Sequence, residues 1–299
     1  MALAGQAFAA PKGFFARRGL PIGLQLYTLG GVVGSDLEAT MLRVGAIGYR
    51  EVELPSYLGH KPAELRAVAD KAGVKITSLH IGAKSMGGSP GLDWEPARLA
   101  ADLKILGADS VVVPIAPMPA GGGRPNPGEE GGAFMSRVIS SQGPDYWKGV
   151  AALLNERGAA LAAEGLKLGY HNHNIEFAPL GGTTGWDILV KETNPKFVSF
   201  ELDVGWVAAA GLDPVAMLRR LSGRVTKLHV KDLLATTQPN FALKMDPTEV
   251  GSGTIDWKRL LPAAYRAGVR HFYVEQEPPF KFDRLVSVAK NYAYLSTQV

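Results

Sequence analysis

The sequence predicts a single (β/α)8 barrel, in which eight parallel strands alternate with helices. Its length of 299 residues is near the usual size of such a barrel, so length does not require a second domain. Short β-rich segments alternate with stretches whose apolar residues recur at helical spacing. The eight β-rich segments are Ile22–Tyr27, Glu51–Leu54, Lys75–His80, Ser110–Pro114, Lys167–His171, Val198–Asp203, Val225–Val230 and His271–Glu275. We expect the barrel to span residues 21–299.

The stretches between these strands carry helical patterns. In the first of them, Leu37, Met41, Val44 and Ile47 fall on one face of a helix. The expected helices are Leu37–Ile47, Pro62–Ala72, Pro96–Leu106, Tyr146–Glu164, Pro214–Leu221, Trp257–Ala267 and Phe282–Tyr294. Glycine commonly follows them, as it does where a helix must end before a strand: Gly48, Gly73, Gly107, Gly165, Gly223 and Gly268.

An open, doubly wound sheet is the alternative arrangement of such repeats. Its first strand usually leads into a helix through a G-x-G-x-x-G turn. Here the turn is TLGGVVG (28–34), which lacks that pattern, so the closed barrel is favoured.

Two long segments follow the fourth and seventh strands. Residues 117–143 are rich in Gly and Pro, and residues 233–253 end in Gly251-Ser252-Gly253. Both leave the C-terminal ends of strands, where the active sites of barrels lie. The first is expected to be either a lid or an insertion without structure, and the second to cover the site.

Composition excludes several classes of function. The chain has 32 basic and 28 acidic residues, and no basic cluster that would bind nucleic acid. It has no cysteine, which excludes disulfides and thiolate metal sites. No apolar run is long enough to span a bilayer, so we expect no membrane association.

The first residues have a different character. Residues 2–10 (ALAGQAFAA) are small and apolar, and Ala7-Phe8-Ala9 fits the pattern that precedes a signal cleavage point. Residues 1–20 are therefore expected to be a flexible leader or the remnant of a trimmed export signal. The protein would be cytoplasmic in the first case and exported to the periplasm in the second.

Imidazoles and carboxylates gather at the ends of the predicted strands. Four of the six histidines lie there, namely His80, His171, His173 and His229. The carboxylates are Glu53, Glu201, Asp203, Glu275 and Glu277. Side chains at i and i+2 of a strand share a face, so Glu201 lies with Asp203 and His229 with Lys231. Unpaired buried charge is costly, and a divalent cation is the simplest partner for such a set.

A metal ion is therefore expected at Asp203, His229 and Glu275. Mixed imidazole and carboxylate donors suit Mn²⁺, Zn²⁺, Mg²⁺, Co²⁺ or Fe²⁺. Taken singly, each residue has a structural alternative, such as a helix cap for Asp203 or an ion pair for Glu275. The Trp206 ring is either a wall for the face of a sugar or part of the core.

Seven segments together resemble the sugar phosphate isomerase/epimerase family, the xylose-isomerase-like barrels. They are LQLYT (24–28), EVELP (51–55), YHNHNIEF (170–177), ELDVGW (201–206), GRVTKLHVKD (223–232), GSGTIDW (251–257) and YVEQE (273–277). The resemblance implies one divalent metal, often Mn²⁺, on residues of strands five to eight. It assigns Asp203, His229 and Glu275 as ligands. The fifth-strand ligand of many members is a Glu, where this chain has His171, with His173 as the rival.

The resemblance also implies chemistry on a small carbohydrate. We expect an isomerase or epimerase that forms an enediolate, with Glu275, Lys231 and His173 as catalytic candidates. A nearby cation would lower the pKa of Lys231. His80, Glu53, Trp206 and Gln25 are expected to bind substrate.

Because His171 replaces one of the two Glu residues that family epimerases use, a lyase or dehydratase is the first alternative, including one that cleaves 3-keto-glycosides. A non-catalytic sugar-binding barrel is the second. A related endonuclease is disfavoured because the chain lacks a basic cluster. Members of the family often pair, so a homodimer is expected.

Overall fold

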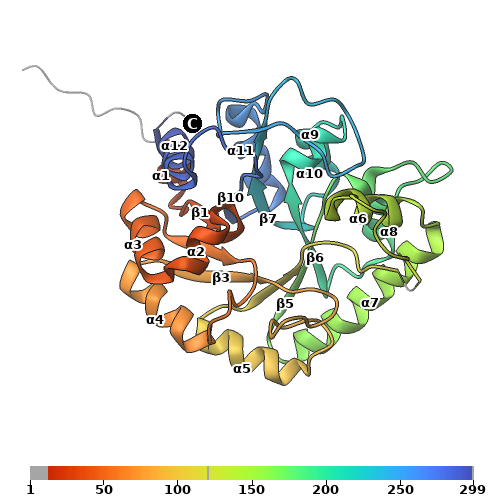
Figure 1. The fold of residues 1–299 in the computed structure, drawn as a ribbon, viewed down its shortest axis with the longest axis horizontal. Helices are drawn as coiled ribbons and strands as arrows, with labels where there is room; N and C mark the ends of the chain where they lie inside the picture. Colours follow the sequence, from red (N-terminus) through yellow and green to blue (C-terminus); the bar gives the residue numbers. More distant parts are fainter. Residues whose placement is uncertain (1–12, 120, 298–299) are drawn as a thin grey trace, which may run out of the picture.

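The computed structural model describes residues 13–119 and 121–297. Eight parallel strands form a closed barrel in the order β1-β10-β7-β6-β5-β4-β3-β2, which confirms the predicted fold (Figure 1). The strands are β1 (Gly23–Gln25), β2 (Glu51–Leu54), β3 (Lys75–His80), β4 (Ser110–Val113), β5 (Lys167–His171), β6 (Val198–Asp203), β7 (Val225–Val230) and β10 (His271–Val274).

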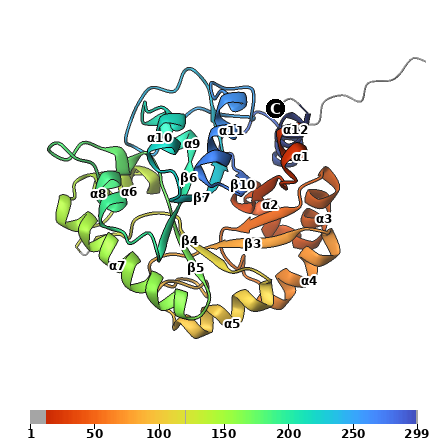
Figure 2. The same cartoon turned by 180° about the vertical axis from the view of Figure 1, so that it is seen from behind.

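Helices surround the barrel on its outside, as both views show (Figures 1 and 2). They are α3 (Leu37–Ile47), α4 (Pro62–Ala72), α5 (Pro96–Leu106), α7 (Pro144–Ala163), α8 (Gly185–Glu192), α10 (Pro214–Arg220), α11 (Trp257–Ala267) and α12 (Arg284–Thr297). The apolar residues between them and the strands form one large core. Among the described residues, no helix is long and apolar enough to cross a membrane.

Several boundaries differ from the predicted ones for local reasons. The first strand ends at Gln25 because Leu26–Leu29 turns into a 3-10 helix, η1, which the Gln25 side chain caps at the Tyr27 amide. Helix α7 begins at Pro144, since proline is well suited to the first turn of a helix. Helix α8 was not expected; Thr184 caps it through the Asp187 amide.

The structure also adds short elements beyond the regular repeats. These are α1 (Phe14–Arg18), α2 (Gly31–Ser35), α6 (Gly131–Ser140), η2 (Ile175–Phe177), α9 (Val204–Ala209) and the antiparallel pair β8 (Asp232–Leu233) and β9 (Pro247–Thr248). Helix α6 lies within residues 117–143, so this segment is not an insertion without structure.

Most of the expected leader lies outside the described residues. Its last part forms α1, whose Phe14 and Phe15 are buried and contact Phe272 with ring centroids 6.1 and 5.4 Å away. Packing against the barrel therefore begins at Phe14, before the expected boundary at residue 21. Whether residues 1–12 are a signal remnant stays a prediction.

Candidate metal centre and active site

The C-terminal ends of the strands bring the predicted side chains together in one buried cluster. Strand pairing places His171 beside Glu201 and Asp203 beside His229. Glu201 and Asp203 both point into the barrel at different depths, as the alternation of side chains along a strand predicts. The cluster therefore has a deeper level around Glu201 and an upper level around Asp203.

At the deeper level, two carboxylates face three imidazoles. Glu201 Oε1 lies 2.9 Å from His80 Nε2, 3.1 Å from His229 Nε2 and 3.2 Å from His171 Nδ1. Glu53 Oε2 lies 2.8 Å from His229 Nε2 and 3.1 Å from His80 Nε2. Gln25 Nε2 donates a hydrogen bond of 2.9 Å to the same Glu53 oxygen. These contacts fix the His229 ring from below.

At the upper level, Lys231 lies between three carboxylates. Its Nζ is 2.6 Å from Glu275 Oε2, 2.9 Å from Asp203 Oδ2 and 2.9 Å from Glu277 Oε1. His229 Nδ1 lies 3.0 Å from the same Glu275 oxygen. The Lys231 side chain is almost fully buried, so these carboxylates are its counter-charges.

Local structure holds the upper ligands in place. The other Asp203 oxygen, Oδ1, accepts the Trp206 amide at 2.9 Å and caps α9. The Asn172 side chain accepts the Asp203 amide at 3.0 Å and donates to its carbonyl at 3.3 Å. Buried Glu176 accepts the Tyr170 hydroxyl at 2.8 Å and the His173 amide at 2.9 Å. The Y-H-N-H segment is thus fixed on both sides of His171.

The charges in the cluster compensate each other. Burial opposes the charged forms, yet the carboxylates Glu53 and Glu201 raise the pKa of His80 to about 9. In the same way Asp203, Glu275 and Glu277 outweigh burial and raise the pKa of Lys231 well above its usual value. These carboxylates therefore raise the pKa of Lys231, whereas a nearby cation was expected to lower it. Burial together with the charge of His171 holds the pKa of His173 well below its usual value.

The four predicted ligands fit a divalent metal ion. One ligand atom each of His171, Asp203, His229 and Glu275 lies within 4.8 Å of the others. A second group, formed by His80, His171, Glu201 and His229, meets the same condition. In that deeper group a single Glu201 oxygen already contacts all three imidazoles. The upper group offers two carboxylates against a double positive charge, and its His171 and Glu275 line a cavity.

Asp203 Oδ2, which belongs to the upper group, supports this fit. Among the residues that the structure describes, no donor makes a hydrogen bond to this buried oxygen, although Lys231 Nζ lies 2.9 Å away. His229 Nε2 lies against Glu53, so Nδ1, which faces Asp203 and Glu275, is the nitrogen that would bind a metal after releasing its proton. Metal binding by these residues remains a prediction.

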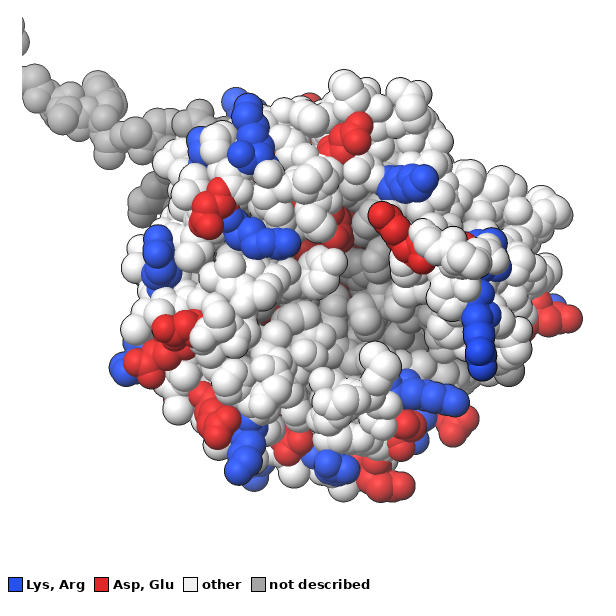
Figure 3. All heavy atoms as spheres, in the orientation of Figure 1, with Lys and Arg blue, Asp and Glu red and all other residues white. Residues whose placement is uncertain are grey.

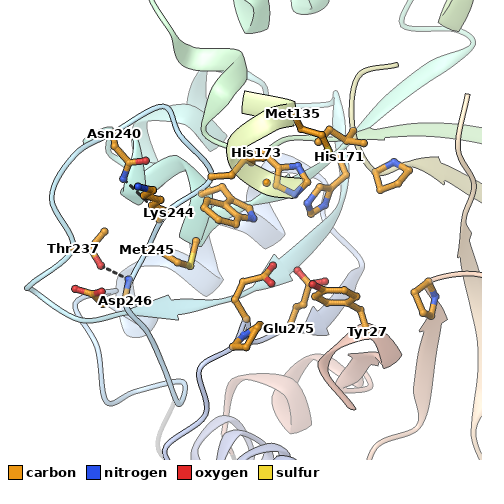
Figure 4. Close-up of a pocket in the computed structure, with 18 of the residues that line it drawn as sticks. Tyr27, Met135, His171, His173, Thr237, Asn240, Lys244, Met245, Asp246 and Glu275 are labelled. Atoms are coloured by element: carbon orange, nitrogen blue, oxygen red, sulfur yellow. Dashed lines mark hydrogen bonds between the residues drawn. The ribbon is translucent and has the colours of Figure 1, made fainter. Parts of the chain in front are cut away.

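A cavity of about 930 Å³ opens above the cluster. In the space-filling view the molecule is hollowed on this face, with acidic side chains near the rim (Figure 3). The close-up shows His171 and His173 on one side of the cavity, with Tyr27 and Glu275 on the other (Figure 4). The residues between β8 and β9 form another wall.

The structure sorts the predicted site residues by their access to this cavity. Glu275, His173, His80 and Trp206 line it. Lys231, Glu53 and Gln25 are fully buried beneath or beside the ligands. Glu53 and Gln25 lie behind His229 and His80 and do not line the cavity, so their predicted contact with substrate stays a prediction. Lys231 positions the carboxylates of Asp203 and Glu275.

Other lining residues were not predicted. They include Tyr27 and Met135, and Asn240, Leu243, Lys244 and Met245 between β8 and β9. Tyr27 lies in the LQLYT segment, within η1. The expectation that residues 233–253 cover the site did point to this wall, but did not identify its residues.

Comparison with known proteins identifies the family of the chain. Residues 42–289 match the model of the family described as xylose isomerase-like TIM barrel. An inosose dehydratase from Geobacillus thermodenitrificans is 30% identical over 146 residues, which are 43% of this chain and 48% of that protein. The match thus spans about half the length of this curated relative.

Solved structures share the fold over nearly the whole chain. A sugar phosphate isomerase/epimerase from Parabacteroides distasonis superposes with a TM-score of 0.72 and 24% identity, covering 98% of this chain and 96% of that one. The IOLI protein with a bound zinc atom has a TM-score of 0.63 and 16% identity, covering 93% and 98%. With a barrel closed around these strand-end side chains and a family match over most of its length, the chain belongs to the xylose isomerase-like TIM barrel family.

Proposed function

We propose that this protein is a divalent-metal-dependent enzyme that removes a proton from the carbon beside a carbonyl group of a small carbohydrate. The observation that carries the proposal is the convergence of His171, Asp203, His229 and Glu275 at the floor of the cavity. Held there, a divalent cation would act as a Lewis acid that stabilises negative charge developing on the carbonyl oxygen. Mn²⁺ is the first metal to test, and Zn²⁺ the second.

His173 is the base that we assign to the proton transfer. Its ring lines the cavity, and its pKa is lowered by burial and by neighbouring His171, so the ring is neutral at physiological pH. A neutral imidazole beside the substrate can accept a proton, whereas the carboxylate of Glu275 is occupied by Lys231 and His229.

Tyr27 is suited to protonate an oxygen atom that leaves the substrate. It lines the cavity on the side opposite His173 (Figure 4). The charge of Glu277 and partial burial raise the pKa of Tyr27 to about 12. The hydroxyl therefore keeps its proton at neutral pH until a strongly basic oxygen develops next to it.

Together these residues support elimination, with the substrate as a keto-sugar or keto-polyol. His173 takes the proton beside the carbonyl, and the C–H electron pair forms a carbon–carbon double bond. The C–O bond to the β-substituent breaks, and the departing oxygen takes the Tyr27 proton, which solvent then restores. The relatives named inosose dehydratase favour this outcome. The side of the cavity formed by His171 and His173 also favours elimination. An epimerase that works with two carboxylates would need one of them on this side.

Isomerisation or epimerisation is the second candidate, and the sequence alone placed it first. The same loss of a proton, followed by its return at the neighbouring carbon or on the opposite face, would give either reaction. Structural similarity to a sugar phosphate isomerase/epimerase favours it. Its weakness is that Glu275 and Asp246, two of the carboxylates that line the cavity, lie away from the side of His171 and His173 (Figure 4).

Incubation in D₂O tests the proposal. The purified protein with Mn²⁺ or Zn²⁺ is mixed with ketoses, inososes and 3-keto-glycosides, and products are followed by NMR. Deuterium beside the carbonyl is expected with at least one of these compounds, and release of water or of an alcohol identifies elimination. His173→Ala should abolish exchange, whereas His60→Ala, at a half-buried histidine outside the cluster, should leave it unchanged.

A protein that binds these compounds but exchanges no proton with either metal would be a sugar-binding barrel, and the proposed enzyme function would be rejected. Exchange that persists in His173→Ala would remove His173 from the role of base.

A further inference from the structure

The cavity extends well beyond the catalytic cluster, under a segment that we call the strap. The strap is residues 234–246, which join β8 to β9. It contributes eight of the residues that line the cavity: Thr236, Thr237, Gln238, Asn240, Leu243, Lys244, Met245 and Asp246. The cavity therefore has an inner compartment at His171 and Glu275 and an outer compartment beneath the strap (Figure 4).

A fully buried side chain next to the proposed base holds the strap in place. Asn174 follows His173 directly, and its Nδ2 donates to the Asn240 carbonyl at 3.0 Å and to Asn240 Oδ1 at 2.9 Å. Asn174 Oδ1 accepts the Leu243 amide at 3.0 Å. From α6, Ser136 Oγ donates to the Phe241 carbonyl at 3.0 Å. The outer wall is thus a fixed surface.

The strap stores backbone strain where it faces the cavity. Leu243 has a φ of 54°, in the left-handed region that a residue with a branched side chain rarely adopts. Such strain is found where surrounding contacts impose it, often at ligand sites. At this position Asn174 Oδ1 accepts the Leu243 amide, and Leu243 lines the cavity.

The outer compartment offers an apolar surface with a polar rim. Met245 packs on the cluster of Trp206, Ala209 and Leu233, and Met135 of α6 also lines the cavity. Thr237 and Lys244 supply polar groups on the strap. A flat, partly apolar group with hydroxyls at its edge, such as a sugar ring, matches this combination.

The volume of the cavity also favours a ligand larger than one sugar ring. At about 930 Å³ the cavity is near the upper end of the range for sites that enclose drug-sized ligands. One sugar ring bound at the inner compartment would leave the surface under the strap without a contact.

We propose that the strap forms a second binding subsite, so that the substrate is a keto-sugar carrying a further ring on its anomeric oxygen. The inference rests on the proposed function, because that function places the keto-sugar at the inner compartment. A ring under the strap would supply binding energy away from the reacting carbon, which an enzyme can use to orient the substrate. Asn174 is the positioning residue that joins the two compartments.

Comparison of one keto-sugar with its own glycosides tests the second subsite. The free sugar, its phenyl glycoside and its glucosyl glycoside are each titrated by calorimetry and assayed for deuterium exchange. In the wild-type protein, binding of at least one glycoside should be at least about 10-fold tighter than binding of the free sugar. Met245→Trp, which fills the outer compartment, should remove this advantage.

Two further variants keep the result interpretable. Ala235→Trp puts the same bulk on an exposed strap residue that does not line the cavity, and should keep the glycoside preference. Lys244→Trp at the exposed rim should weaken glycoside binding if Met245→Trp does not fold. Whichever glycoside binds more tightly shows whether the subsite prefers an aryl group or a second sugar.

The outcomes separate the two proposals. Equal affinity for the free sugar and both glycosides would overturn the second subsite, whether or not exchange occurs. A glycoside preference that Met245→Trp abolishes, without any deuterium exchange, would support the subsite and reject the enzyme function.

Discussion

Gly205 and Lys231 are packed so closely that no side chain fits between them. A Cβ atom at Gly205 would lie 2.7 Å from Cγ, 2.9 Å from Cβ and 3.0 Å from Cδ of Lys231. The Lys231 chain passes over this glycine, and its Nζ lies 5.0 Å from the centroid of the Trp206 ring. The glycine in the ELDVGW segment therefore leaves the space through which Lys231 reaches Asp203 and Glu275.

Replacement of Gly205 by Ala should destabilise the protein by about 1–3 kcal/mol, the usual cost of overpacking a core. The helical position would otherwise favour Ala. Urea unfolding checks the change. Gly149→Ala, at an exposed helical glycine with open space around it, should be neutral or stabilising. In a Lys231→Ala background the cost should shrink, because Cγ and Cδ are gone. An undiminished cost there would assign the effect to another contact.

Lys231→Met should remove the counter-charge of three carboxylates and lower the free energy of unfolding by about 3–5 kcal/mol. Added Mn²⁺ or Zn²⁺ should recover more stability in this variant than in the wild-type protein, because the cation meets uncompensated charge. The rise in melting temperature on adding metal measures this.

Lys227→Met is the matched control for that experiment. Lys227 is also buried in the barrel, but it donates to Ser110 and makes none of the three ion pairs. Metal should stabilise this variant only as much as the wild type. If Lys231→Met shows the same metal response as Lys227→Met, the Asp203 and Glu275 oxygens are not where the metal binds.

His171 and His173 should differ in their effect on metal content. His171 belongs to both groups of side chains that could hold an ion, and His173 belongs to neither. His171→Ala should lose more affinity than the roughly 10–100-fold that follows loss of an outer partner. His173→Ala should keep its metal and lose proton exchange. Elemental analysis after dialysis measures the metal. Metal loss in His173→Ala alone would make His173 the fourth ligand.

Glu176 should make stability fall as pH rises. Burial raises its pKa from the usual 4.5 to about 7, so the folded state holds a proton that the unfolded chain releases earlier. Stability from this group is present below about pH 4.5 and is lost as pH rises to about 7. In Glu176→Gln the difference in free energy of unfolding between about pH 5 and pH 8 should change by up to about 3 kcal/mol in favour of the alkaline side.

Glu249→Gln should change the pH dependence of stability in the opposite direction. Although burial raises the pKa of Glu249, hydrogen bonds from Ser287 and Gln276 outweigh it and lower the pKa. This carboxylate stabilises the fold above its unfolded pKa, and the contribution is lost as pH falls. Glu249→Gln should therefore lose stability on the alkaline side, and chemical denaturation across pH separates the two cases. Parallel pH profiles for both variants would contradict the account of Glu176.

The sequence by itself determined the barrel, its strands and the set of side chains at the strand ends. These depend on local signals: apolar periodicity, glycines that end helices, and the alternation that places Glu201 and Asp203 on one face. Strand pairing then had only to close the barrel for His171, Asp203, His229 and Glu275 to converge.

Depth and contact across the barrel were decided only by the tertiary structure. The pairing of β2 with β3 shifts register between Val52 and Glu53, and the pairing of β6 with β7 shifts between Phe200 and Glu201. Periodicity along one strand carries no information about such shifts or about the height of neighbouring strands. Glu53 therefore lies behind the histidines, and Lys231 lies buried between three carboxylates. The hydrogen bonds from Asn174 to the strap also depend on the tertiary structure. Asn240 and Leu243 are 66 and 69 positions away from Asn174 in the sequence, and only the closed fold brings them together.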